Sequence, residues 1–438
     1  MGEASAARRV LEDLFRAALR GADAAAAVAR NVAVRADGGL ALGGATLASD
    51  QRIVLLSAGK AAAPMAAALL AAAPGRVARG LVVTKEGHGA PVAGLELRET
   101  AHPVPDERCA AAGRAALEFA AHGQAGEALV VLLSGGASSL LACPADGLTL
   151  ADLAATTELL LRSGADIEEA NAVRKHLSCL AGGQLAAAWR GGPIVLLAAS
   201  DVPGDRLDVI GSGPCTPDPS TFADAWQVVT RRGMGDALPA AVRDVLEAGC
   251  AGRRAETPKG LPPVAARVIV SNASALEAAR DAAARAGLRA AIDPQPLAGE
   301  ARDAALRVLA DARRAAGAAP LVWLAGGETT VRFEPGVPTG RGGRNQELAL
   351  AAALEIAGQA GVTLLAAGID GSDGPTDAAG AVADGGTVAR GAERGADAGS
   401  ALACHDSHSF FDAEGGILRT GPTGTNVMDV AFVNLERD

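Results

Sequence analysis

The sequence predicts an α/β protein, and three of its features carry this prediction. Short runs rich in Val, Ile and Leu alternate with Ala-rich segments of helical length, which is typical of βα units around a largely parallel sheet. The 438 residues are enough for two to three domains, each with a core of its own. Hydrophobic residues make up 49% of the chain, a share that excludes wholesale disorder.

The first predicted element is an amphipathic helix within residues 1–30, with Val10, Leu14 and Ala17 or Ala18 on one face. This segment lacks the apolar core and cleavage site of a signal peptide. The expected strands are residues 53–57, 81–84, 128–133, 194–199, 267–270, 321–324 and 363–367. We expect helices after most of these strands.

One stretch of the sequence predicts a domain boundary. Residues 249–263 combine Gly, Pro and charged residues without an apolar period, as linkers do. We therefore expect an N-terminal domain at residues 1–250, a linker at 251–263 and a C-terminal domain at 264–438. The Gly-dense residues 385–399 are expected to form a surface loop or weak helix inside the second domain.

Charge and composition exclude several classes of protein. A net charge of −10, an aromatic content of 2% and the absence of Tyr argue against a nucleic-acid binder, which needs cationic patches and stacking rings. The longest Ala-rich stretch, residues 61–74, is short and interrupted by proline, so no membrane segment is expected. The six Cys form no CxxC pair, which predicts buried free thiols. A cytoplasmic enzyme is the simplest setting.

Four predicted strands run directly into Gly-rich turns, at residues 57–60, 134–139, 325–330 and 368–374. Backbone N–H groups at such turns point outward, and glycine lets an anion come close. A single Gly turn could be merely tight, but four together favour a phosphorylated or nucleotide ligand. The candidate nucleotide-binding residues in these turns and in two later motifs are Ser134, Gly135, Gly136, Ser138, Ser139, Gly326, Gly327, Glu328, Asn345, Asp370 and Asn426.

The common catalytic and nucleotide-binding fingerprints are missing from the sequence. There is no GxxxxGK[ST], which excludes a P-loop, and no GxGxxG that opens a helix, which disfavours a conventional Rossmann dehydrogenase. GxSxG and HExxH are also absent, so an α/β-hydrolase and a zinc protease are disfavoured.

Cationic residues stand at two of the candidate loops. Lys60 follows a strand and precedes a helix, where its ammonium could lie beside an anion. Arg344 follows the Gly-rich residues 339–343, and its guanidinium suits phosphate or carboxylate oxygens. Asn171, Arg174 and Lys175 share one helical face by their spacing, a face that could equally be solvated.

Carboxylates also gather at loop ends. Asp201, Asp205 and Asp373 are the predicted metal ligands, because Mg²⁺ favours oxygen donors. Asp201 is also the candidate for activating a hydroxyl nucleophile, with Asp205 and Asp370 as rivals. Asp is a common turn residue as well, so a purely local role stays open for each.

Nine short motifs occur in order along nearly the whole chain and together carry a family resemblance. They are SAGKAA (57–62), LLSGGASSLL (132–141), NAVRKHLS (171–178), SDVPGD (200–205), SGPCTPDPST (212–221), AGGETTV (325–331), GRGGRNQELAL (340–350), DGPTDAAGA (373–381) and TGPTGTNV (420–427). In these motifs the chain resembles the class II glycerate kinases, whose C-terminal part is called the MOFRL domain.

The resemblance implies a two-domain α/β enzyme with a Rossmann-like N-terminal α/β/α sandwich and an active site in the interdomain cleft. It implies phosphorylation of the 2-hydroxyl of D-glycerate with ATP and Mg²⁺, and it marks Lys60 and Arg344 as the functional cations. A homodimer is left open. Two alternatives also stay open: an NAD(P)H-dependent hydroxypyruvate reductase, against which the lack of GxGxxG speaks, and a non-catalytic binding protein for small organic acids.

Overall fold

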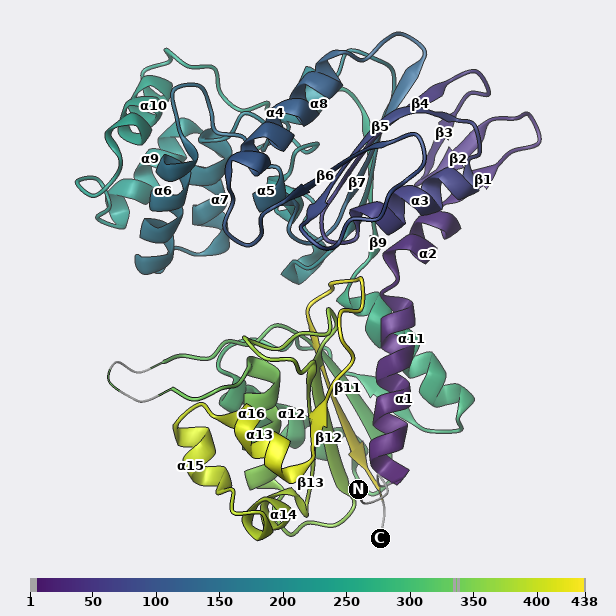
Figure 1. The fold of residues 1–438 in the computed structure, drawn as a ribbon, viewed down its shortest axis with the longest axis vertical. Helices are drawn as coiled ribbons and strands as arrows, with labels where there is room; N and C mark the ends of the chain where they lie inside the picture. The colour runs from purple at the N-terminus through teal and green to yellow at the C-terminus, as the bar shows by residue number, and fades with distance from the viewer. Residues whose placement is uncertain (1–5, 334–335, 337–338, 437–438) are drawn as a thin grey trace. The chain divides into compact units, whose positions relative to one another are not determined.

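The computed structural model describes residues 6–333, 336 and 339–436. They form two compact units (Figure 1). Residues 24–269 make up one, the central unit. The described parts of residues 1–23 and 270–438 make up the other, the terminal unit.

This division differs from the expected boundaries at two places. Helix α1 (Ala6–Gly21) belongs to the terminal unit, because it packs along α11 (Asn272–Arg285). Residues 251–263 belong to the central unit, because strand β9 (Val264–Val270), which follows them, lies at the edge of that unit's sheet.

The central unit is built on a six-stranded sheet in the order β6-β5-β4-β7-β8-β9. The pairs from β6 to β8 are all parallel. Its other strands are β4 (Arg52–Ala58), β5 (Val77–Lys85), β6 (Glu96–Thr100), β7 (Glu127–Leu133) and β8 (Ile194–Ala199). Residues of β4, β7 and β8 are almost all buried, which explains why these strands read as continuous apolar runs.

Helices cover both faces of this sheet (Figure 1). Small residues of α4 (Glu107–Ala121) and α8 (Gln184–Ala188) pack on one face in a single apolar cluster. Helix α3 (Ala62–Ala72) packs against β4 and β5. The connection from β4 through α3 to β5 crosses the sheet in the opposite direction to the connection from β6 through α4 to β7. Because crossovers between parallel strands are right-handed, α3 lies on the face opposite α4. The predicted α/β/α sandwich is therefore confirmed.

The remaining elements of the central unit lie outside these layers. A second apolar cluster joins α6, α7, α9 and α10 and includes Leu160, Val173 and Phe222. A small antiparallel sheet has the order β1-β2-β3. The elements are β1 (Val32–Val34), β2 (Leu40–Leu42), β3 (Ala45–Leu47), α2 (Ala24–Arg30), α5 (Ala137–Leu140), α6 (Leu150–Arg162), α7 (Ile167–His176), α9 (Phe222–Arg231), α10 (Ala240–Cys250), and the 3₁₀ turns η1 (Pro203–Asp205) and η2 (Ile210–Ser212).

The terminal unit also has a six-stranded sheet, but its strands are not largely parallel as predicted. The order is β10-β11-β15-β12-β13-β14, and only β10 and β11 are parallel. Its strands are β10 (Ala290–Ile292), β11 (Leu321–Gly327), β12 (Val362–Gly368), β13 (Gly380–Asp384), β14 (Ile417–Leu418) and β15 (Asp429–Leu435). β15 enters between β11 and β12, antiparallel to both, because no helical crossover precedes it.

Two layers of helices enclose this second sheet (Figure 1). α1 and α11 pack together on one face, and α1 buries Leu11, Leu14 and Phe15 there. α12 and α13 pack on the other face over the main apolar cluster of the unit. The helices are α12 (Ala301–Ala316), α13 (Arg344–Glu355), α14 (Thr387–Glu393), α15 (Ala398–Ala403) and α16 (Ser407–Glu414). Of the Gly-dense residues 385–399, 387–393 form α14, and 398 and 399 begin α15.

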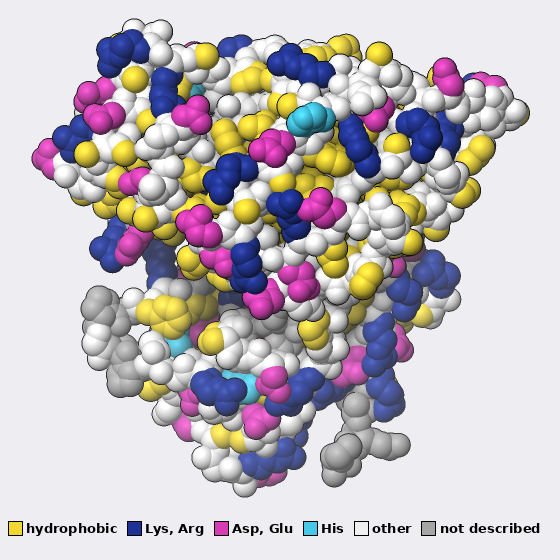
Figure 2. Space-filling view, turned by 45° about the horizontal axis from the view of Figure 1, so that its top comes forward, with side chains coloured by type: hydrophobic (Ala, Val, Ile, Leu, Met, Phe, Trp, Pro, Cys, Tyr) yellow, Lys and Arg dark blue, Asp and Glu magenta, His cyan; other side chains and the backbone are white. Residues whose placement is uncertain are grey.

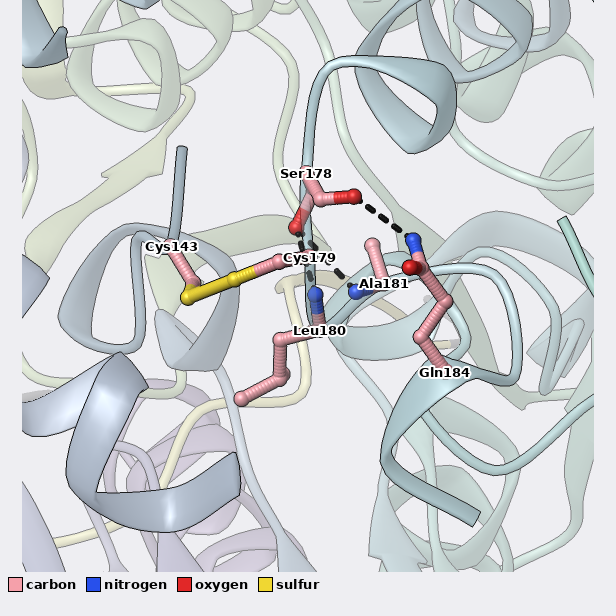
Figure 3. The surroundings of a disulfide bond; sticks show 6 residues. All are labelled: Cys143, Ser178, Cys179, Leu180, Ala181 and Gln184. Atoms are coloured by element: carbon pink, nitrogen blue, oxygen red, sulfur yellow. Dashed lines mark hydrogen bonds between the residues drawn. A yellow bond between two sulfur atoms is a disulfide. The ribbon is translucent and has the colours of Figure 1, made fainter. Parts of the chain in front are cut away.

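The prediction of buried free thiols is wrong for two cysteines, since Cys143 and Cys179 form a disulfide (Figure 3). An antiparallel bridge between Pro144 and Ser178 brings the two segments together, and the Cys179 N–H donates to the Cys143 carbonyl at 2.9 Å. The Ser178 hydroxyl accepts the N–H groups of Leu180 and Ala181 at 3.1 Å each. The four free cysteines also include an exposed one, Cys250.

The face drawn in Figure 2 shows Lys and Arg side chains interspersed with Asp and Glu rather than gathered in one basic patch. Within the described ranges, no helix combines the length and the apolar character needed to cross a membrane.

Candidate active site

The central sheet contains a point where the direction of strand addition reverses. From β4 the chain adds β5 and β6 on one side, and then β7 and β8 on the other. Ligands of open α/β sheets bind at the carboxyl ends of the two strands that flank such a switch point. Here those strands are β4 and β7, which lead into the predicted turns at residues 57–60 and 134–139.

The two turns are joined by direct hydrogen bonds. The Lys60 N–H donates to the Gly135 carbonyl at 2.9 Å, and the Ala61 N–H donates to Ser134 Oγ at 3.0 Å. Gly59 has a φ of 127°, and a Cβ there would lie 2.1 Å from Ser134 Oγ, so only glycine fits. The structure thus brings together two of the predicted Gly-rich turns, those that carry Lys60 and Ser134.

Positive charge gathers on the Lys60 side of this site. Burial, together with the nearby charges of Lys60, Lys85 and His88, lowers the pKa of His102 to about 4. The pKa of His88 is lowered too, by burial and by the same two lysines. Both imidazoles are therefore neutral near pH 7, and the two lysines supply the cationic charge available to an anion.

A cavity of about 540 Å³ opens beside these loops within the central unit. Five predicted site residues line it, namely Ser134, Gly136, Ser138, Ser139 and Asp201. The Ser138 and Ser212 hydroxyls lie 3.0 Å apart at its wall. Asp205 is not among the lining residues. It lies in η1 with a φ of 53°, directly after the left-handed Gly204.

Two further lining residues, Asn171 and Arg174, come from α7. The sequence had left their helical face open between a solvated surface and a functional one. Asn171 is only 5% exposed, so a merely solvated role is excluded for it. The i, i+3 spacing of an amide and a guanidinium was the signal that could have placed both residues at the site.

In the terminal unit, Arg344 is the first residue of α13 and lies in a network of carboxylates. Its Nε and Nη2 donate to the Asp429 carboxylate at 2.5 and 3.0 Å, and its Nη1 lies 2.5 Å from Glu328. Burial acts to lower the pKa of Arg344, but the two carboxylates raise it above its usual value. Burial also raises the pKa of Asp429 to about 6, against the opposing effect of Arg344.

Asp373 caps the start of α13. Its Oδ1 accepts the backbone and side-chain N–H groups of Asn345 at 3.0 and 3.2 Å. Its Oδ2 accepts the corresponding groups of Gln346 at 2.8 and 2.9 Å. Burial raises the pKa of Asp373, although these bonds act to lower it. Each carboxylate oxygen already accepts two hydrogen bonds, so the structure accounts for Asp373 and Asn345 by local folding.

The predicted glycines at the end of β11 are explained by close packing. A Cβ on Gly326 would lie 1.9 Å from Oδ1 of Asn272, whose Nδ2 donates to the Val427 and Asp429 carbonyls at 2.8 and 2.9 Å. A Cβ on Gly327 would lie 2.3 Å from the Leu297 carbonyl oxygen. These two glycines therefore let the chain segments that carry Arg344's partners approach each other.

Two other candidates lie in turns of the same unit. Asp370 accepts the N–H and the hydroxyl of Ser372, both at 3.0 Å, and Asn426 accepts the N–H of Met428 at 3.2 Å. Among the described residues, no group of three or more His, Cys, Asp and Glu side chains is arranged to hold a metal ion.

Comparison with known proteins decides the family. The profile described as a domain of unknown function (DUF4147) matches residues 10–247, and the MOFRL family profile matches residues 321–429. A glycerate 2-kinase of Pyrococcus horikoshii is 40% identical over 387 residues, 87% of this chain and 87% of that protein. The chain belongs to the MOFRL-domain family of glycerate 2-kinases.

Two further relatives of this MOFRL-domain chain bear on its fold and function. The crystal structure of a glycerate kinase from Thermotoga maritima matches with a TM-score of 0.84 and 36% identity, covering 98% of this chain and 99% of that one. A protein of Agrobacterium vitis with the provisional name hydroxypyruvate reductase is 42% identical over 435 residues, 98% of this chain and 94% of that protein. The predicted family and two-domain α/β fold are confirmed.

Proposed function

We propose that this protein is a D-glycerate 2-kinase that transfers a phosphoryl group from ATP to the 2-hydroxyl of D-glycerate. One observation carries the proposal: in a chain of this family, a cavity large enough for a nucleotide opens at the switch point of the central sheet, lined by the loop to which the Lys60 N–H is bonded. The family relationship supplies the substrate class, and the cavity supplies a place for it in the fold.

Lys60 is the proposed electrostatic centre of the reaction. Phosphoryl transfer depends mainly on positioning and on stabilising negative charge, so a fixed cation at the transferring group is the most valuable residue. The hydrogen bonds of residues 60 and 61 to the loop at residues 134–135 hold the Lys60 backbone in place. Because the pKa of His102 is lowered to about 4, its imidazole is neutral near pH 7 and adds no charge to that of the lysines.

Arg344 is the proposed second functional cation. Asp429 holds one edge of its guanidinium, which fixes the orientation of the group. Its Nη1 contacts Glu328, whose side chain is 42% exposed. An incoming anion can replace this exposed carboxylate at Nη1 while the buried pair with Asp429 stays intact.

Asp201 is the proposed acidic residue of the site. It follows β8 and lines the cavity, where it can hold Mg²⁺ or accept the proton of the 2-hydroxyl. When bound, Mg²⁺ supplies charge neutralisation at the phosphate oxygens. Asp205, four residues later, is kept as a possible second ligand. Asp373 is left out because its oxygens cap α13.

The direct test supplies the purified protein with D-glycerate and Mg-ATP, follows ADP, and identifies the product by ³¹P NMR. We expect 2-phosphoglycerate. Lys60→Met should lower kcat about 10²- to 10³-fold, as loss of a transition-state charge stabiliser does. Lys259→Met removes a lysine that bonds to Ser220 and Thr257 outside the cavity lining, and it should keep wild-type turnover.

A parallel reaction with hydroxypyruvate and NADH tests the reductase alternative. Oxidation of NADH without ADP formation in the first assay would replace the kinase proposal with a reductase. Activity in neither assay, together with binding of D-glycerate, would favour the non-catalytic binding protein.

A further inference from the structure

The cavity of the central unit contains a buried polar atom without a partner. Asn171 is 95% buried as judged by its 5% exposure, and its Nδ2 makes no hydrogen bond to any residue that the structure describes. A buried donor left unsatisfied costs about 1–3 kcal/mol. Since Asn171 lines the cavity, a ligand acceptor there would satisfy this donor.

Arg174, one turn further along α7, has the same property. The guanidinium is half-buried and lines the cavity, but it forms no hydrogen bond or ion pair within the described part of the chain. Burial alone lowers the pKa of Arg174. Two carboxylates, Glu158 and Asp201, also line the cavity, but Arg174 pairs with neither. A desolvated guanidinium without an ion-pair partner is suited to an anion such as phosphate or carboxylate.

The other basic residues of α7, Lys175 and His176, do have partners. Lys175 Nζ lies 3.4 Å from Asp218 and 3.8 Å from Asp208, and His176 Nε2 lies 3.1 Å from Glu256. The two basic side chains of α7 outside the cavity lining, Lys175 and His176, therefore have carboxylate partners, whereas Arg174 in the lining has none within the described residues.

The same cavity has a strongly apolar part. Val104, Leu161 and Ile167 all line it, and they are 70%, 72% and 55% exposed. Large aliphatic side chains exposed together at a cavity are typical of a surface that a ligand covers. The ligand thus combines an anionic group with a flat or apolar one.

The spacing along α7 gives the order of these two parts. Ile167, Asn171 and Arg174 stand at i, i+4 and i+7 and share one face of the helix. A rise of 1.5 Å per residue separates the first from the last by about 10 Å. This span is comparable to the distance from the base to the terminal phosphate of an extended nucleoside diphosphate, and it is longer than a three-carbon acid.

We propose that this cavity is the adenine-nucleotide site, in which Asn171 and Arg174 bind the phosphates and Val104, Leu161 and Ile167 cover the base. The volume of about 540 Å³ suits a nucleotide and far exceeds what glycerate fills. The assignment rests on the proposed kinase function for the choice of nucleotide. It also explains how a chain with so few aromatic residues holds a purine, since aliphatic side chains pack against its faces.

The test is isothermal titration calorimetry of the full chain with Mg-ADP and, separately, with adenosine. Arg174→Met should weaken ADP about 10- to 100-fold and leave adenosine unchanged, because adenosine has no phosphate. Leu161→Asp should weaken both ligands at least 10-fold. Arg174 has no partner among the described residues, and Leu161 is mostly exposed. We therefore expect both variants to unfold at the same urea concentration as the wild type.

Two matched controls accompany these variants. Arg114→Met removes an exposed arginine of α4 in the same unit, and Leu306→Asp changes a 47% exposed leucine of α12; both should bind ADP as the wild type does. Wild-type ADP affinity in Arg174→Met and Leu161→Asp would overturn the assignment. So would a rise in the KM for D-glycerate with ADP binding unchanged, because Arg174 would then bind the acid.

The failure of this assignment differs from the failure of the proposed function. If the wild type phosphorylates D-glycerate but the variants bind ADP as the wild type does, the assignment of the nucleotide site is wrong and the proposed kinase function stands. If ADP binding depends on Arg174 and Leu161 but D-glycerate is not phosphorylated, the proposed kinase function is wrong and the assignment of the nucleotide site stands.

Discussion

The cavity of the central unit and the Arg344 network of the terminal unit contain the same kinds of side chain in opposite states. Each has an arginine and an asparagine near Gly-rich turns that follow strands. In the terminal unit, carboxylates satisfy Arg344 and Asn345. In the central unit, Arg174 and the amide of Asn171 face a cavity without partners. The partners of these side chains, rather than their residue types, therefore distinguish a cavity with open donors from a network in which an anion must first replace a carboxylate such as Glu328.

Breaking the network in the terminal unit should have the largest effect on stability. Arg344→Met leaves the buried carboxylate of Asp429 without its cation, so we expect the free energy of unfolding to fall by about 3–5 kcal/mol in urea titrations. The double variant Arg344→Met with Asp429→Leu removes both charges and should recover most of this loss. If Arg344→Met is as stable as the wild type, the ion pair of Arg344 with Asp429 does not stabilise the terminal unit as we expect.

The cap of α13 should be the next most sensitive feature. Asp373→Asn replaces an oxygen that accepts two hydrogen bonds with an amide group that donates, so two N–H groups lose their acceptor. We expect a loss of about 1–3 kcal/mol in the free energy of unfolding. Asp412→Asn, an exposed aspartate of α16, is the control and should lose less than 0.5 kcal/mol. An equal loss in the two variants would mean that Asp373 is not a cap.

The corresponding change in the central unit should not destabilise the protein. Arg174→Met removes a desolvated charge that has no partner, and so the free energy of unfolding should stay within about 0.5 kcal/mol of wild type or increase. Urea unfolding of the ligand-free protein measures this. A loss as large as that of Arg344→Met would show that Arg174 is part of the folded framework and not a ligand-binding group.

The smallest expected effect is a pH dependence in the central unit. The pKa of His102 is about 4 in the folded protein and about 6.5 when unfolded, so protons bind preferentially to the unfolded chain. Its contribution to stability is complete above pH 6.5 and decreases as the pH falls towards 4. His102→Asn should therefore show a shallower loss of stability over this window.

The sequence was sufficient to predict the parts of the fold that depend on local patterns. The continuous apolar runs of β4, β7 and β8 predicted strands of a largely parallel sheet, and the Gly-rich turns after β4 and β7 were predicted as ligand-binding loops; the structure joins these two turns. Carboxyl ends of neighbouring parallel strands lie at one edge of a sheet, so this part of the site follows from strand order alone.

Features that depend on long-range pairing were not predictable. β15 lies antiparallel between β11 and β12, although nothing in its own residues specifies that place. The disulfide joins Cys143 to Cys179 because a β-bridge between their neighbours, Pro144 and Ser178, aligns two segments that are far apart in the sequence. Asp373 was expected to bind metal and caps a helix 28 residues away, since a carboxylate suits both tasks and only the fold selects one.

A crystal structure of the full chain with Mg-ADP tests the central claim most directly. The account predicts phosphate oxygens within hydrogen-bonding distance of the Arg174 guanidinium and Asn171 Nδ2, with the adenine against Leu161 and Ile167. Nucleotide bound at Glu328 and Arg344 instead, with the cavity of the central unit left to solvent, would contradict it.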